Sequence, residues 1–342
     1  MSKYNTDLDY AIVDIDISRE ELEEIKAEAD RIISENKESN ENLAAAYLKK
    51  VQCIRKLGEG KTIGFIFYEE NLLSLYHDAG KSVEKEDLKN LLEKALELSP
   101  DMPEAFMQLG LLNRHCLLVL RFDNEGEAKD WLSKAIQLKP CYAAAFNNRA
   151  MLFFDPTIEI LFDLDKDKIE NVKIDYKNAV ADLTEGIRIR PFDAIYRLNR
   201  GVFHSRLGEH NEAIEDFSSA INYASDVLKD KLKTEVLIFN LRGKEYMELK
   251  EYRKAIEDFT ETLRLGDNHF FVIKGISEYE FSNRNYVDTF LMRGKAYYLA
   301  GEKDKAKADF EEYLKRKQKS GCDKSRTEEE IFKHIGVMPE DI

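Results

Sequence analysis

A spaced set of small and aromatic residues recurs three times toward the end of the chain. In each copy a glycine is followed twelve residues later by an alanine and four residues after that by a phenylalanine: Gly201, Ala213 and Phe217; Gly243, Ala255 and Phe259; Gly294, Ala306 and Phe310. Two amphipathic helices need small residues where their backbones come closest, and a bulky residue beside them. The fixed spacing therefore predicts stacked helix pairs, in which each pair leaves an apolar face for the next pair to cover.

The same register continues upstream in weaker form. One earlier copy holds Gly110, Ala128, Leu132, Ala135 and Pro140, and the next holds Ala150, Ala179, Leu183, Gly186 and Pro191. A degenerate first copy follows from Tyr47, Val51, Gly58, Leu92, Ala95 and Pro100. The sequence predicts about six repeats over residues 41–318, bounded at about 41–100, 101–140, 141–191, 192–226, 227–267 and 268–318.

This spacing resembles that of the tetratricopeptide repeat, a unit of two helices joined by a turn. The family places small residues at repeat positions 8, 20 and 27, an aromatic residue at 24 and often Pro at 32. The resemblance implies an all-α fold, a right-handed superhelical solenoid of helix-turn-helix units. A length of 342 residues would allow two domains, but a solenoid has no single core to outgrow, so one continuous array is expected.

Several stretches do not fit the regular spacing. Extra residues fall inside the first three repeats, near 59–87, 121–127 and 156–178, and between later repeats, at 226–233 and 268–286. Two of these stretches, Ile63–Tyr76 and Phe270–Phe281, are too apolar to remain in water. They are interpreted as lengthened helices and added helical segments. Support of the scaffold is preferred over a binding role, although insertions in repeat arrays often gather on a binding face.

Both ends are expected to carry a helical cap. Residues 1–40 form an acidic segment whose Ser18–Asn36 stretch predicts an amphipathic helix, opened by a capping box of Ser18 and Glu21. Residues 319–342 are expected to hold a second cap, with a capping box at Thr327 and Glu330 and apolar residues at Ile331, Ile335 and Met338. A docking tail over 323–342 is the alternative.

Charge and composition exclude several classes of partner. The net charge of −14 argues against nucleic acid and anionic membranes, because both are bound through an excess of Lys and Arg. No apolar run reaches the roughly 18 residues needed to span a bilayer, and the start lacks the pattern of a secretory signal. The four cysteines are scattered without a Cys-x-x-Cys pair, as expected of free thiols in the cytoplasm.

No catalytic, metal or cofactor site emerges from the sequence. The six histidines lack metal-binding spacing, and the His115–Cys116 pair lacks further ligands. Asp163, Asp165 and Asp167 imitate the start of a calcium loop, but Lys168 and Ile174 stand where Gly and Glu are required. The chain is expected not to be an enzyme and to need no cofactor.

One polar pattern accompanies the repeats. The position before the small residue of the first helix is Arg in repeats three to six, and the same repeats carry Asp before their aromatic or leucine: Arg149 and Asp182, Arg200 and Asp216, Arg242 and Asp258, Arg293 and Asp309. Repeat two has Leu109 and Trp131 instead. The joint occurrence predicts an ion pair between the two helices of each repeat. A ladder of Arg that binds an acidic ligand is the alternative.

The resemblance also implies where a partner would bind. In this family the first helix of each repeat lines a concave groove, and the corresponding positions here are Met107, Leu111, Asn147, Met151, Phe154, Leu198, Val202, Ser205, Asn240, Lys244, Met247, Leu291, Lys295 and Tyr298. Such a lining suits an extended or helical peptide, with apolar anchors and amides for its backbone. In the alternative interpretation the insertions fill the groove and these residues belong to the core.

A branch of the family binds the C-terminal carboxylate of chaperones through paired Lys, Asn and Arg side chains. Asn148 and Asn199 occupy one of those places, but the flanking positions hold apolar residues, so no counter-charge for a carboxylate is present. The sequence therefore favours a non-catalytic cytoplasmic scaffold that binds a protein or peptide. A peptide-sensing regulator that changes curvature and, less favoured, a helical enzyme are the alternatives; the sequence does not indicate an oligomeric state.

Overall fold

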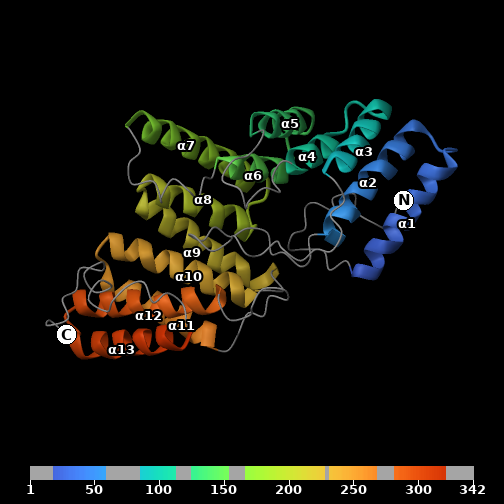
Figure 1. The fold of residues 1–342 in the computed structure, drawn as a ribbon. Helices are drawn as coiled ribbons and strands as arrows, with labels where there is room; N and C mark the ends of the chain where they lie inside the picture. The colour runs from blue at the N-terminus through green and yellow to red at the C-terminus, as the bar shows by residue number, and fades with distance from the viewer. Residues whose placement is uncertain are drawn as a thin grey trace. The chain divides into compact units, whose positions relative to one another are not determined.

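The computed structural model describes residues 18–58, 85–112, 125–153, 166–227, 231–267 and 281–320. These residues form helices and hold no β-strand, which confirms the predicted all-α fold (Figure 1). In chain order the helices are α1 (Arg19–Glu35), α2 (Asn40–Gly58), α3 (Lys85–Leu98), α4 (Pro103–Leu112), α5 (Glu125–Leu138), α6 (Ala143–Leu152), α7 (Lys166–Ile189), α8 (Ala194–Leu207), α9 (His210–Val227), α10 (Lys231–Glu248), α11 (Tyr252–Asp267), α12 (Phe281–Leu299) and α13 (Lys303–Ser320).

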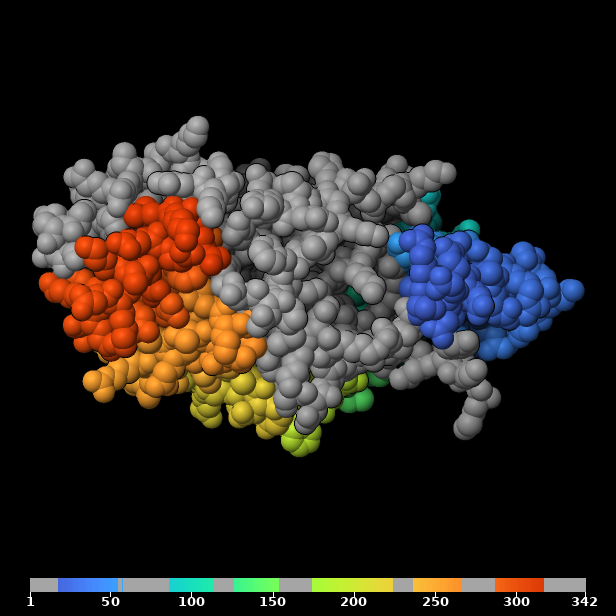
Figure 2. Space-filling view, turned by 90° about the horizontal axis from the view of Figure 1, so that it is seen from below, coloured from blue at the N-terminus to red at the C-terminus, as the bar shows by residue number. Residues whose placement is uncertain are grey.

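The chain divides into two compact units, Met1–Phe192 and Asp193–Ile342. Within each unit, helices that follow one another in the sequence pack against each other, as in repeat proteins. The pairs α8–α9, α10–α11 and α12–α13 are the three regular repeats of the second unit. Figure 2 shows the surfaces of these helices following one another from yellow to red. In the first unit, α2–α3, α4–α5 and α6–α7 are the three earlier pairs, and α1 packs on α2.

Close packing within each pair explains the glycine of the repeat pattern. A Cβ added at Gly201, Gly243 or Gly294 would lie 2.7, 2.8 or 2.6 Å from a ring carbon of Phe217, Phe259 or Phe310, respectively. Real side chains essentially never approach so closely, so each glycine makes room for the aromatic ring of the second helix. Gly110 does the same for Leu132, which takes the place of the phenylalanine in α5.

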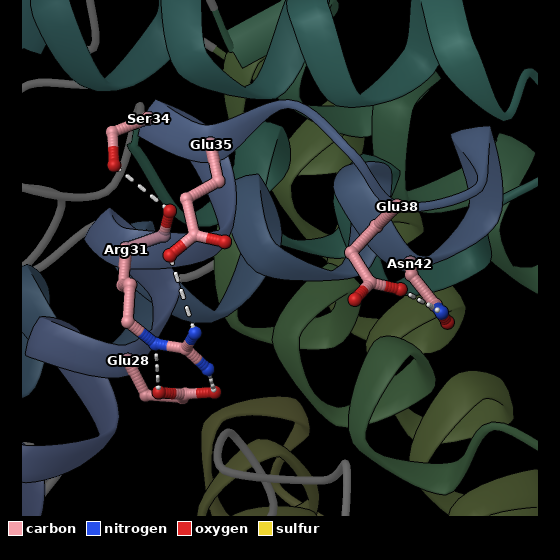
Figure 3. Close-up of polar contacts among 6 residues, drawn as sticks. All are labelled: Glu28, Arg31, Ser34, Glu35, Glu38 and Asn42. Atoms are coloured by element: carbon pink, nitrogen blue, oxygen red, sulfur yellow. Dashed lines mark hydrogen bonds and ion pairs between the residues drawn. The ribbon is translucent and has the colours of Figure 1, made fainter.

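The N-terminal cap forms as predicted. Ser18 accepts a hydrogen bond from the backbone N–H of Glu21, whose side chain accepts one from the N–H of Ser18, so the capping box is confirmed. Leu22 and Ile25 of α1 pack against Cys53 of α2. The opposite face of α1 is charged, and Arg31 binds Glu28 at 2.6 Å and Glu35 at 3.4 Å (Figure 3). Between α1 and α2, Glu38 accepts a hydrogen bond from Asn42 of α2. The hydrogen bond from Arg31 lowers the pKa of Glu28.

The described residues confirm part of the interpretation of the irregular stretches. The helices α7, α10 and α12 begin inside the stretches 156–178, 226–233 and 268–286, so each of these is a lengthened helix at least in part. The apolar stretch 63–76 and residues 270–280 lie outside the described residues, as does the expected C-terminal cap at 327–338.

Candidate partner-binding surface

The predicted ion pairs are present in all four repeats. In each, Nε and Nη2 of the arginine donate to the two carboxylate oxygens of the aspartate, at 2.6–2.8 Å. The pairs join the first helix of a repeat to its second helix. Because the aspartates are buried, each arginine is held by its own repeat, and the alternative of a ladder that binds an acidic ligand is not supported.

The arginines make a further contact that sequence reasoning missed. Nη1 of Arg149, Arg242 and Arg293 donates to a hydroxyl of the preceding repeat, on Ser133 at 3.1 Å, Ser218 at 2.9 Å and Thr260 at 3.2 Å. Ser133 and Thr260 donate their own protons to a backbone carbonyl four residues earlier, at 2.7 Å, which leaves the hydroxyl oxygen free to accept. The arginine thus connects two successive repeats as well as the two helices of one repeat.

A signal for this contact exists in the sequence. Five residues after the small residue of the second helix, repeats two to five carry a hydroxyl: Ser133, Thr184, Ser218 and Thr260. Each of these repeats precedes one that carries the arginine. The corresponding positions of the first and last repeats, which precede no such arginine, hold Glu93 and Glu311. Hydroxyl, arginine and aspartate therefore occur together along the chain.

Burial moderates what these ion pairs contribute. The hydrogen bond with Asp216 raises the pKa of the Arg200 guanidinium. At the next repeat, burial acts to lower the pKa of Arg242, but the hydrogen bond with Asp258 outweighs it and the pKa is raised. Burial raises the pKa of Asp258, although its hydrogen bond with Arg242 acts in the opposite direction. The rise at Asp258 means that removing the carboxylate from water offsets much of the gain from pairing.

The contact between repeats predicts a small, measurable effect. Ser218→Ala removes the hydroxyl that accepts from Arg242 and should destabilise the chain by about 1 kcal/mol relative to Ser219→Ala. The neighbouring Ser219→Ala makes the same gain in helix propensity and is the control. Urea denaturation measures both. Equal midpoints for the two variants would contradict a stabilising role for the hydroxyl.

The predicted groove residues fall into two groups. The side chains of the first group are buried, with exposed fractions of 8% or less: Met107, Leu111, Met151, Leu198, Val202 and Asn240. Their burial agrees with the alternative interpretation, in which groove positions belong to the core. The second group is partly exposed: Asn147, Ser205, Lys244, Met247, Leu291, Lys295 and Tyr298. Phe154 lies outside the described residues.

Asn240 illustrates why truncating a residue of the first group would change the stability of the chain as well as any binding. Its side-chain amide donates to the hydroxyl of Thr289 at 2.9 Å, and both side chains are buried. This bond joins α10 to α12, the first helices of two successive repeats. Asn240 therefore stabilises the contact between repeats, and its replacement is expected to lower stability.

Five of the seven partly exposed side chains lie on two neighbouring helices, α10 and α12. Lys244 and Met247 belong to α10, and Leu291, Lys295 and Tyr298 belong to α12. The spacings of three and four residues place each set on one face of its helix. We call these five residues the α10–α12 face. It offers two ammonium groups, one phenol, one flexible thioether and one aliphatic side chain.

Ser205 is used within the protein. Its hydroxyl donates to Glu245 at 2.6 Å, and the other oxygen of Glu245 lies 2.7 Å from Nδ1 of His210. Glu245 is 4% exposed, so a buried carboxylate of α10 bridges side chains of α8 and α9. This trio is not a nucleophile with its base, because the carboxylate stands between the hydroxyl and the imidazole. Within the described residues, no group of three or more His, Cys, Asp or Glu side chains could hold a metal ion.

Comparison with known proteins identifies the repeats. The family model described as "Tetratricopeptide repeat" matches residues 194–227 and 287–320, which contain α8–α9 and most of α12 with α13. These two stretches thus match the tetratricopeptide repeat, in agreement with the spacing of their small and aromatic residues. No helix among the described residues is long and apolar enough to cross a membrane.

Two curated proteins resemble parts of the chain. The small glutamine-rich tetratricopeptide repeat-containing protein 2 of Saccharomyces cerevisiae is 31% identical over 83 residues, which cover 24% of each chain. Human tetratricopeptide repeat protein 13 is 25% identical over 204 residues, covering 57% of this chain and 21% of the human protein. The chain thus spans less than a quarter of the length of these relatives.

The solved structures that match the chain are more distant in sequence. A structure of MamA protein is 15% identical with a TM-score of 0.46, covering 66% of this chain and 97% of MamA. YrrB, titled as a TPR protein with an unusual peptide-binding site, is 13% identical with a TM-score of 0.47, covering 66% of this chain and 92% of YrrB.

Proposed function

We propose that this protein is a non-catalytic cytoplasmic scaffold that binds a peptide segment of a partner protein on its α10–α12 face. The observation that carries the proposal is the set of five partly exposed side chains on the first helices of two adjacent repeats. The match of residues 194–227 and 287–320 to the tetratricopeptide repeat supports the general role. The proposal narrows the fourteen groove residues expected from the sequence to the five that a partner could contact on these two helices.

The chemistry of the face favours a peptide as ligand. Met247 is flexible and polarisable, and Tyr298 combines a large apolar ring with a hydroxyl, so both adapt to varied side chains. Lys244 and Lys295 occupy the same position in successive repeats, one residue after the packed glycine. A peptide lying across the two helices would meet one lysine per repeat, and carboxylates or backbone carbonyls could accept from them.

The test compares partners captured by two forms of the full chain. The face variant carries Lys244→Ala, Met247→Ala and Lys295→Ala. Its partly exposed side chains leave little cavity when truncated, so its melting temperature should stay within a few degrees of the wild type. Affinity purification from the source organism with quantitative mass spectrometry should show at least one protein that binds the wild type and is lost from the variant.

A matched control distinguishes the loss of the α10–α12 face from the loss of positive charge elsewhere on the chain. Lys94→Ala with Lys307→Ala removes two exposed lysines from the second helices α3 and α13. The control should retain the partner, and calorimetry with the purified partner should reproduce the difference. A partner that binds both variants as well as the wild type would place its site elsewhere and contradict the proposal.

A further inference from the structure

Lys295, on the α10–α12 face, is a cation without a counter-charge in the described part of the chain. Its side chain is partly buried on α12. Among the residues that the structure describes, no carboxylate lies within ion-pair distance of its ammonium, and no hydrogen-bond acceptor or aromatic ring contacts it. Removing a charged group from water costs free energy unless an opposite charge or hydrogen-bond partners take the place of the water. Lys295 is therefore available to bind an anion supplied from outside.

Comparable lysines of this protein are paired. The partly buried Lys50 binds Asp30 at 2.6 Å, and the partly buried Lys139 binds Glu104 at 2.9 Å. In both cases the acidic side chain comes from another helix, Asp30 from α1 and Glu104 from α4. A lysine that is partly buried by folding thus receives a carboxylate from a neighbouring helix at these two sites. Lys295 departs from this arrangement.

The helix around Lys295 also lacks an acid at the positions where helical side chains meet. Side chains three and four residues apart lie on one face of a helix. The residues at these distances on either side of Lys295 carry no charge: Leu291, Met292, Tyr298 and Leu299. By contrast, Lys254 and Lys305 each pair with a Glu three residues earlier in the sequence. An anion that reaches Lys295 would enter surroundings rich in carbon, where its attraction to the ammonium is stronger than in open water.

We propose that the peptide bound by the α10–α12 face carries an Asp or Glu whose carboxylate pairs with Lys295, an inference that rests on the proposed function. An aliphatic side chain within four residues of that acid contacts Leu291, which is partly exposed one helical turn before Lys295. The ligand is thus an acidic and aliphatic segment within a partner protein. The proposed function alone leaves open whether the lysines meet carboxylates or backbone carbonyls.

A carboxylate fits this position better than a backbone carbonyl. A carbonyl accepts a hydrogen bond but leaves the charge of the ammonium in place, whereas a carboxylate accepts the bond and neutralises the charge. The chain as a whole is acidic, with a net charge of −14, and repels an acidic ligand at long range. That repulsion is largely screened beyond about 8 Å at physiological ionic strength, so the contact with Lys295 determines the preference.

The test selects peptides against the full chain and against Lys295→Met, which keeps the length of the side chain and removes its charge. The probe is a phage library of random 12-residue peptides, fused through their C-termini so that only side chains supply carboxylates. The control is Lys307→Met, which removes an exposed lysine of α13. Wild type and control should select peptides enriched in Asp or Glu within four residues of Leu, Ile or Val, and Lys295→Met should lose the acidic enrichment.

Affinities of individual peptides measure the contact directly. Acidic peptides should bind Lys295→Met about tenfold or more weakly than the wild type, as expected for loss of one hydrogen bond between charged groups. Their variants with Asn or Gln in place of the acid should bind both forms equally. The melting temperature of Lys295→Met should equal or slightly exceed that of the wild type, because the change removes a cation without a counter-charge. A clearly lower melting temperature would show that Lys295 has a partner within the chain and overturn the inference.

The remaining outcomes separate this inference from the proposed function. Acidic enrichment that persists against Lys295→Met would place the carboxylate elsewhere and reject the pairing with Lys295. Peptides without an acid that lose binding in Met247→Ala but not in Lys295→Met would support the proposed function while rejecting this inference. Peptides that are insensitive to both changes, or a selection that yields no peptide, would contradict the proposed function as well.

Discussion

Phe259→Ala is expected to lower the free energy of unfolding by about 3–5 kcal/mol, which is the largest single effect predicted for this chain. The ring is fully buried between α10 and α11 and fills the space left by Gly243. Its loss leaves a cavity that cannot collapse, because the helix backbones already approach closely at the glycine. Guanidinium denaturation followed by circular dichroism measures the change.

Phe192→Ala is the matched control for this experiment. Phe192 is 69% exposed, so the same truncation removes few packing contacts and should change stability by only about 0.5 kcal/mol or less. The equivalent changes Phe217→Ala and Phe310→Ala should resemble Phe259→Ala, since each ring lies against a glycine of its own repeat. A cost for Phe259→Ala as small as that of Phe192→Ala would contradict the packing described here.

The Arg242–Asp258 pair is expected to show coupling in a double-mutant cycle. Either single change to Ala strands the other charge in a partly buried site and should cost about 2 kcal/mol. The double change should cost less than the sum of the two single changes, with a coupling of about 1 kcal/mol or more. Its magnitude is moderated because burial of Asp258 offsets part of the attraction.

The exposed pair Arg264 and Glu261 supplies the comparison cycle. Its charged atoms lie 2.7 Å apart, the same distance as in the Arg242–Asp258 pair, but the side chains are 60% and 40% exposed. Coupling there should be only about 0.3–0.5 kcal/mol, because water screens the charges. Equal coupling in both cycles would mean that burial adds nothing, and an uncoupled Arg242–Asp258 cycle would remove the support for the ion pair.

The repeat fold and its ion pairs were predictable because their causes are periodic. A glycine, an alanine and a phenylalanine at fixed spacing encode a close helix crossing wherever they occur, so Gly243 and Phe259 identify their own contact. Arg242 and Asp258 recur in the same register, and a charge that recurs with its counter-charge indicates a pair. The capping box of Ser18 and Glu21 is local and needs no distant residue.

Only the tertiary structure decided which predicted groove residues a partner could reach. The sequence gives Asn240 and Lys244 the same character, since both are polar and lie on one helix face. In the folded chain Asn240 is buried and donates a hydrogen bond to Thr289, whereas Lys244 stays partly exposed. Ser205 and His210 contact Glu245 across 40 and 35 residues of sequence, respectively. No repeating pattern in the sequence indicates this contact. The sequence by itself predicts the repeat fold, because the residues that form it recur at fixed spacing. Contacts that occur only once depend on how particular side chains meet, so only the folded chain shows them.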